Sequence, residues 1–266
     1  MATIAAQYDA PAQGERFFST LAIIMGLTVV AGFSVQFLAG RSTFASPLRV
    51  HAHAVLFMGW VAIFVTQARL GTHGPIALHR RLGWLALGWI AAMMAAAMVV
   101  IVAMARNGTV PFFFQPQHFL IADPLTLICF IALTVLAVRK RRETDWHARL
   151  QICAMTLLTG PAFGRLLPMP LLKPYAFEAA GLATTVFLFA GMIRDWRLSR
   201  AIHPAWWFGF AGLAVNLIGA QVLAHSPVGD AVYQEVVAGY PGAAIPGLEF
   251  GVPPQSPLIT GRGPAT

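Results

Sequence analysis

The sequence predicts an all-α membrane protein that crosses the bilayer several times. Hydrophobic residues make up 58% of the 266-residue chain and charged residues only 11%, with a mean hydropathy of +0.68. A soluble domain carries about 25% charged residues, so this chain lacks the polar surface that a globule in water needs. Several stretches of 19 or more residues contain no Asp, Glu, Lys or Arg, which is about the length that crosses a bilayer core. Apolar runs such as residues 91–105 do not alternate with polar residues, as the strands of a membrane β-barrel would.

We expect seven transmembrane helices, at residues 17–40, 49–69, 76–105, 118–138, 146–167, 174–193 and 205–224. Pro75, Pro174 and Pro204 stand at the starts of the third, sixth and seventh spans. Proline suits this position because the first turn of a helix does not use its N–H groups. Short connections join spans 2 to 5, and they predict a central four-helix bundle of alternating direction.

The basic residues predict how the chain is oriented. Seven spans place 12 of the 18 basic residues on the side of the N-terminus: Arg16, Arg69, Arg80, Arg81, Arg139, Lys140, Arg141, Arg142, Arg149, Arg194, Arg197 and Arg200. The positive-inside rule then puts the N-terminus in the cytoplasm and the C-terminus outside. We expect a multi-pass protein of the plasma (inner) membrane. Because the charges lie between spans and can contact anionic lipid headgroups, the net charge of +8 does not indicate nucleic acid.

The chain divides into a transmembrane domain, residues 1–225, and an extramembranous C-terminal tail, residues 226–266. The tail is rich in Pro and Gly and has no helical period. Its Tyr233, Tyr240 and Phe250 favour a segment that lies along a partner, as in a subunit of a larger membrane complex. Cys129 and Cys153 both fall inside spans, where we expect small core residues.

Histidines begin four successive spans, and their spacing repeats. His51 and His118 are 67 positions apart, and His79 and His147 are 68 apart. In an up-down-up-down bundle the like-directed helices lie diagonally across the core. Spans 2 and 4 therefore offer one histidine pair at the outer end, and spans 3 and 5 offer another at the cytoplasmic end. Two histidines that face each other across a bundle can ligate haem iron from both sides of a flat ring.

This layout, over residues 49–170, resembles cytochrome b561 and related di-haem membrane cytochromes. The resemblance implies two b-type haems, held by His51 or His53 with His118 and by His79 with His147. It also implies electron transfer across the membrane, as an oxidoreductase or electron carrier, with quinone as a partner. The family's ligands lie inside the hydrocarbon, whereas His79 directly precedes Arg80 and lies close to the interface. Arg80 could therefore pair with haem propionates, or reach to lipid headgroups.

A second similarity concerns His53, Trp60, Gln67 and the residues HRRLGW at 79–84. It is shared with a group of bacterial multi-span membrane proteins of undescribed function. His51 and His53 are about 200° apart around a helix, so only one of them faces the bundle. The repeat spacing favours His51, whereas the second similarity favours His53.

Other interpretations of these residues remain open. If residues 51–53 are extended, His51, His53 and His118 could bind copper or zinc at the outer face. Histidines at helix ends are also ordinary interfacial groups, and the chain would then be a non-catalytic accessory subunit. Asp123 in span 4 could orient a histidine, relay a proton or contact a quinone, or it is a hydrated carboxylate before the Pro124 bend. Arg165 either lies over an outer haem or marks the end of span 5.

Overall fold

The computed structural model describes residues 13–254, and within that range it contains helices and no β-strand. This confirms the all-helical prediction. The α-helices are α1 (Gln13–Leu38), α2 (Leu48–His73), α3 (Ile76–Arg106), α4 (Pro116–Arg139), α5 (Thr144–Leu158), α6 (Gly160–Leu166), α7 (Ala176–Ala183), α8 (Thr185–Ser199), α9 (Ala205–Ala224) and α10 (Pro227–Val237). Two 3₁₀ helices are η1 (Met169–Leu172) and η2 (Pro241–Ala244).

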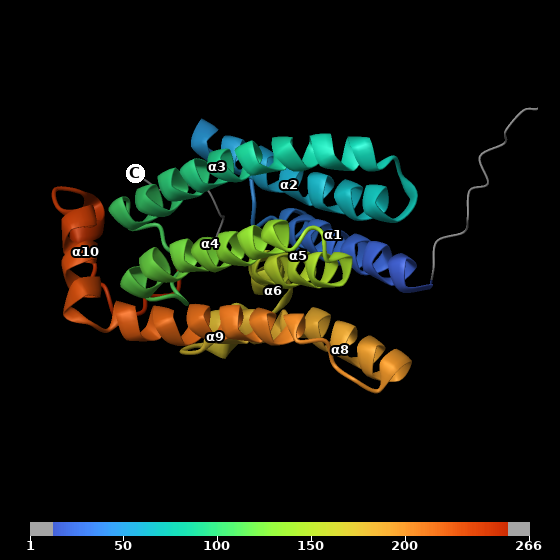
Figure 1. Cartoon of the computed structure of the whole chain (residues 1–266). Coiled ribbons are helices and arrows are strands. Elements are labelled where there is room, and N and C mark those ends of the chain that lie inside the picture. The colour runs from blue at the N-terminus through green and yellow to red at the C-terminus, as the bar shows by residue number, and fades with distance from the viewer. Residues whose placement is uncertain (1–12, 255–266) are drawn as a thin grey trace, which may run out of the picture.

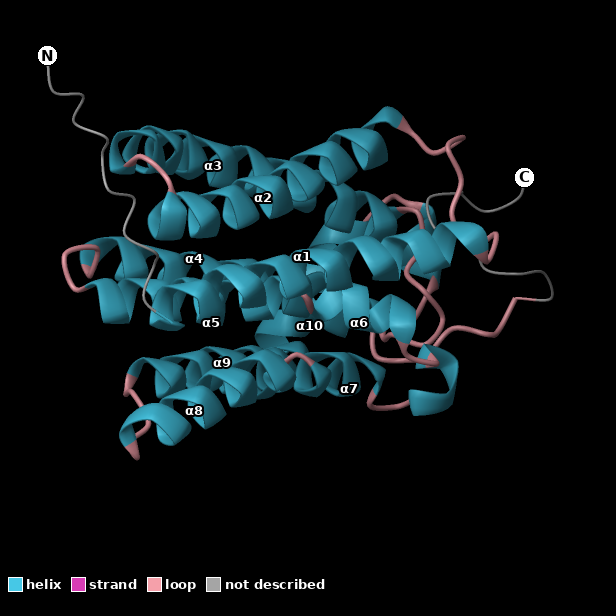
Figure 2. Cartoon of the chain, turned by 90° about the vertical axis from the view of Figure 1, so that its right-hand side faces the viewer, coloured by secondary structure: helices cyan, strands magenta, loops and turns pink. Residues whose placement is uncertain are grey.

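The long helices run side by side in three layers. In Figure 2, α2 and α3 form the upper layer, α1, α4, α5 and α6 the middle layer, and α7, α8 and α9 the lower layer. We call one end of these layers the basic end, because Arg and Lys residues are concentrated in the α4–α5 and α8–α9 connections and in the helix ends beside the α2–α3 connection (Figure 1). At the other end α10 lies across the ends of the long helices (Figure 1), and we call it the capped end.

Six helical segments are long and apolar enough to cross a membrane. They are Arg16–Leu38, Leu48–His73, Ile76–Arg106, Pro116–Arg139, Ala176–Ser199 and Ala205–Ala224. Large apolar side chains also face outward from them, among them Leu27, Val55, Trp84 and Ile218, each more than 60% exposed. Exposed apolar surface on this scale needs a nonaqueous environment. The chain is therefore a multi-pass membrane protein.

The fifth expected span, residues 146–167, is not one continuous helix. It is divided at Thr159 into α5, of 15 residues, and α6, of 7 residues. Pro161 lacks the N–H that a continuing helix would use. The described residues thus hold six helices of spanning length where we expected seven. The sixth expected span, residues 174–193, corresponds to α7 and α8, which together form one segment of spanning length.

Helix α5 lies at the centre of the fold, in contact with α1, α4, α8 and α9. Eight of its 15 residues are buried. Small residues allow the neighbouring helices to approach closely. A methyl group at Gly191 would overlap the ring of Trp206, and one at Gly209 would crowd the Cys153 sulfur. Cys153 and Cys129 are both buried and free, which confirms that they are core residues.

The C-terminal segment folds back onto its own chain as far as residue 254. Helix α10 contacts α3, α4 and α9. The backbone N–H of Gln117 donates to the Gly247 carbonyl at 2.8 Å, and its side-chain Nε2 donates to the Ala224 carbonyl at 2.6 Å. Arg106 Nε donates to the Val236 carbonyl at 2.9 Å. The predicted tail is therefore, over residues 227–254, a cap on the helix ends, and residues 255–266 lie outside the described residues.

Candidate functional site

The structure brings His79 and His147 together at the basic end. Their ring centroids are 6.2 Å apart and their planes are at 81°. His79 is the fourth residue of α3 and His147 is the fourth residue of α5. These are the two helices that the sequence predicted to lie diagonally.

A main-chain carbonyl fixes each ring. His79 Nδ1 lies 3.2 Å from the carbonyl oxygen of Gln67, near the end of α2. His147 Nδ1 lies 2.8 Å from the carbonyl oxygen of Ala137, near the end of α4. A carbonyl oxygen only accepts hydrogen bonds, so each Nδ1 carries the proton and donates. In the neutral ring the lone pair is then on Nε2, and among the described residues neither Nε2 has a hydrogen-bond partner.

The separation of the rings suits two imidazoles that share one metal ion. A histidine nitrogen binds a transition metal at about 2.0 Å, so two rings on opposite sides of one ion have centroids about 6 Å apart. The observed 6.2 Å agrees with this value. A ligating histidine also commonly donates its other ring N–H to a backbone carbonyl or carboxylate, which sets the tautomer and the ring orientation. The ring separation and the Nδ1 hydrogen bonds of His79 and His147 are therefore compatible with a ligand pair.

Four buried polar atoms in the described structure have no hydrogen-bond partner: Trp60 Nε1, Gln67 Oε1, His118 Nε2 and Thr134 Oγ1. All four lie on α2 or α4. Gln67 is the residue whose carbonyl holds His79, and Thr134 lies one turn before Ala137, whose carbonyl holds His147. Buried polar groups are nearly always satisfied, so such atoms mark places where a ligand or water belongs. Sequence reasoning had noted Trp60 and Gln67 only as part of a motif and had missed Thr134.

The histidines nearer the capped end, His51, His53 and His118, are not joined in the same way. His51 Nε2 lies 3.1 Å from the carbonyl oxygen of Phe44 in the α1–α2 loop. His53 stacks on Phe57 of its own helix, with centroids 4.2 Å apart. The buried His118 packs edge-on against Phe177 of α7, at 5.1 Å. No ring contact between either of the α2 histidines and His118 occurs among the described residues.

Arg165 lies on α6 and is half-buried. Its guanidinium lies over the Phe33 ring at 4.0 Å from the centroid, and its Nη1 donates to the Pro161 carbonyl at 2.8 Å. Arg80, by contrast, is exposed at the basic end.

A buried ion pair that sequence reasoning missed lies two residues beyond His147. Arg149 Nε and Nη2 each donate to Asp195 of α8, both at 2.8 Å. Trp206 Nε1 of α9 donates to the same carboxylate at 2.7 Å, and Arg194 lies 3.1 Å from it. The two paired residues are 46 positions apart, and nothing in their local sequence signals the contact. This network joins α5, α8 and α9 close to His147 in the sequence of α5.

Within residues 13–254 no three His, Cys, Asp or Glu side chains come together in an arrangement that could hold a metal ion. The expected copper or zinc site of His51, His53 and His118 therefore has no support from this arrangement. Comparisons with protein-family models, with curated proteins and with solved structures found no match for the chain.

Proposed function

We propose that this chain is a membrane electron-transfer protein in which His79 and His147 would hold a b-type haem. The observation that carries the proposal is the geometry of this pair. The rings come from different helix hairpins and lie nearly perpendicular with their centroids 6.2 Å apart, and each has its Nδ1 held by a carbonyl. Two Nε2 lone pairs remain for one iron.

The chain's own residues prepare this site. The carbonyls of Gln67 and Ala137 accept from the histidines, which holds the rings and makes Nε2 a better ligand. Bound haem would supply reversible one-electron oxidation and reduction of its iron. The partnerless Gln67 Oε1 and Thr134 Oγ1 lie on the helices that supply these carbonyls. Arg80 follows His79 directly and is the residue we assign to the haem propionates at this end.

A second haem in the outer half would use His118, with His53 as its partner. His118 Nε2 is buried without a hydrogen-bond partner, which suits a ligand nitrogen. His51 Nε2 already lies against the Phe44 carbonyl, so His53 is the better candidate of the two. Arg165, whose guanidinium lies over the Phe33 ring on the neighbouring α1, is the cation we assign to the propionates there. Two haems at different depths would carry electrons through the bilayer.

The remaining parts of the proposal concern the membrane. If α5 and α6 together make a crossing, the chain crosses seven times, with the basic end in the cytoplasm by the positive-inside rule. A bacterial-type inner (plasma) membrane fits a protein of this kind, and quinone is the small molecule with which it would exchange electrons. Asp123, an acidic residue within the span Pro116–Arg139, is the group that would face a quinone or a proton path at the outer half.

The test is haem content together with an optical spectrum. The chain, expressed with ample haem precursor and purified in detergent, should show a reduced-minus-oxidised spectrum with b-type α bands and about two haems per chain. His147→Ala should remove one of the two haems, and His118→Ala should remove the other. His73→Ala, at the basic end but outside the ligand set, is the matched control and should keep both.

A purified chain without haem would contradict the proposal, as would equal haem content in wild type and His147→Ala. A wild-type chain that always carries one haem, and loses it in His147→Ala but not in His118→Ala, would support the His79–His147 site and refute the second haem site. Co-purification of a haem-free chain with a large assembly would instead identify an accessory subunit.

A further inference from the structure

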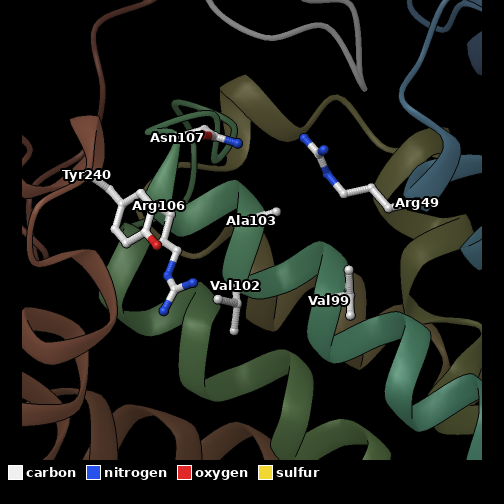
Figure 3. Close-up of a pocket in the computed structure, with 7 residues that line it drawn as sticks. All are labelled: Arg49, Val99, Val102, Ala103, Arg106, Asn107 and Tyr240. Carbon is white, nitrogen blue, oxygen red and sulfur yellow. The ribbon is translucent and has the colours of Figure 1, made fainter.

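A pocket of about 370 Å³ lies at the capped end, outside the histidine sites. Its lining residues are Arg49, Val99, Val102, Ala103, Arg106, Asn107 and Tyr240. Figure 3 shows the wall of α3 running through the pocket, with Arg49 reaching in from α2 and Tyr240 standing beside Arg106. Two arginines and no acidic residue line this space, so its positive charge is not compensated within the pocket.

The two arginines are held differently. Arg106 is fixed: its Nε donates to the Val236 carbonyl at 2.9 Å, and its guanidinium stacks over the Tyr240 ring at 4.5 Å. This leaves its terminal nitrogens to bind a ligand. Arg49 has no hydrogen bond or ion pair with any described residue, and its guanidinium points across the pocket toward Ala103 and Asn107 (Figure 3).

The depth of the pocket matches that of a lipid headgroup. Arg49 is the second residue of the span Leu48–His73, and Arg106 is the last residue of the span Ile76–Arg106. Since α2 and α3 run in opposite directions, both guanidiniums come to the same membrane surface. Val99 lies seven residues before Arg106, about 10 Å deeper along the helix, and is 54% exposed. An apolar wall therefore continues from the charged site into the hydrocarbon.

We infer that this pocket binds the phosphate headgroup of an anionic phospholipid, with the guanidiniums of Arg49 and Arg106 on the phosphate and an acyl chain along Val99 and Val102. Arginine forms strong charge-assisted hydrogen bonds to phosphate oxygens. A basic pocket between membrane helices at headgroup level is the arrangement that recognises anionic lipids. The lipid would bridge the start of α2 to the end of α3 and to the C-terminal cap. The inference does not depend on haem binding.

The test is lipid binding by the delipidated full-length protein in a neutral detergent. Phosphatidylglycerol and phosphatidylcholine are compared in separate titrations, and bound lipid is counted by native mass spectrometry. We expect phosphatidylglycerol to bind at least about tenfold more tightly. Arg49→Gln should abolish most of this preference. Arg41→Gln is the matched control, because Arg41 is exposed in the α1–α2 loop outside the pocket, and it should keep the preference.

A second variant separates loss of charge from loss of space. Ala103→Phe keeps both arginines but fills the pocket, and it should lower phosphatidylglycerol binding as Arg49→Gln does. Equal binding of the two lipids would overturn the inference, and so would equal losses in Arg49→Gln and Arg41→Gln. Binding that inorganic phosphate at the same concentration competes away completely would assign the site to a free anion and not to a lipid.

Discussion

The basic end and the capped end of the molecule are held by different kinds of interaction. At the basic end side chains meet across helices, in the Arg149–Asp195 ion pair and in the His79–His147 pair. At the capped end a continuous chain segment, residues 227–254, lies over the helix ends, and its main-chain carbonyls accept hydrogen bonds from Arg106, Gln115 and Gln117. At the basic end, side chains of different helices contact each other, and His79 and His147 lie next to each other. At the capped end, the C-terminal segment covers the helix ends, and within residues 13–254 the histidines there are not brought into contact.

The largest expected effect concerns the buried ion pair. Asp195→Ala leaves Arg149 and Trp206 Nε1 without their shared acceptor in a buried site. Removing one partner of a buried pair costs about 3–5 kcal/mol of unfolding free energy. Thermal unfolding in detergent should show a large drop in Tm. The control is Glu143→Gln, which breaks the exposed Lys140–Glu143 pair and should cost less than about 1 kcal/mol. Equal drops in the two variants would show that the network does not hold the basic end.

The next effect falls on the cap. Gly242 packs against the carbonyl oxygens of Ala105 and Arg106 with no room for a side chain. Gly242→Val should detach the cap at a cost of about 1–3 kcal/mol, while the long helices stay folded. Amide hydrogen exchange should rise over residues 227–254 and stay unchanged at the basic end. Ala243→Val adds a larger side chain at the neighbouring exposed position and should leave exchange as in wild type. A uniform rise along the chain would refute a separable cap.

A smaller effect at the capped end depends on alkaline pH. Burial raises the pKa of Tyr233, whose hydroxyl donates to the Ile245 carbonyl at 3.0 Å. The folded state therefore binds the phenolic proton more tightly than the unfolded state. Its contribution is present below the unfolded pKa of about 10 and is lost as pH rises through the folded pKa. Between pH 9 and pH 11 the wild-type Tm should fall more than that of Tyr233→Phe. If the Tm of wild type and of Tyr233→Phe fall equally between pH 9 and pH 11, Tyr233 does not contribute to the pH dependence of stability.

The smallest effect is at the basic end under mild acid. Burial, and then the charge of Arg149, lower the pKa of His203, although Asp195 and Asp145 act in the opposite direction. Below the unfolded pKa of about 6.5 the unfolded state binds this proton first, so stability falls as pH decreases. His203→Gln should lose slightly less Tm than wild type between pH 7 and pH 5. A larger loss of Tm in His203→Gln than in wild type would mean that Asp195 and Asp145 raise the pKa of His203 more than burial and Arg149 lower it.

The sequence predicted the helical membrane fold because an apolar run of sufficient length has few alternatives in a bilayer. It also identified His79 and His147, since each follows the short connection of a helix hairpin. The interruption of the fifth span was less visible, because Gly160 and Pro161 sit inside an apolar run that composition alone counts as continuous. Pairing of Arg149 with Asp195 depends on how three helices pack, and no local pattern encodes it.

The cap was missed for a related reason. Pro and Gly are frequent in residues 226–254, so the sequence predicted an extramembranous tail without helical period, whereas residues 227–237 form helix α10. Its contacts are made by carbonyl groups that every residue carries, such as the Gly247 carbonyl that accepts from the Gln117 N–H. The amino-acid sequence therefore does not indicate which carbonyl accepts a given hydrogen bond.

The hydrogen bonds of the two histidines have a consequence for assembly. Each bond lies within one hairpin, from His79 to Gln67 and from His147 to Ala137, across only 12 and 10 positions. A hairpin that has just entered the membrane during synthesis can therefore orient its own ring before the second hairpin exists. Docking of the two finished hairpins then brings the rings together, and neither ring depends on the other hairpin for its orientation.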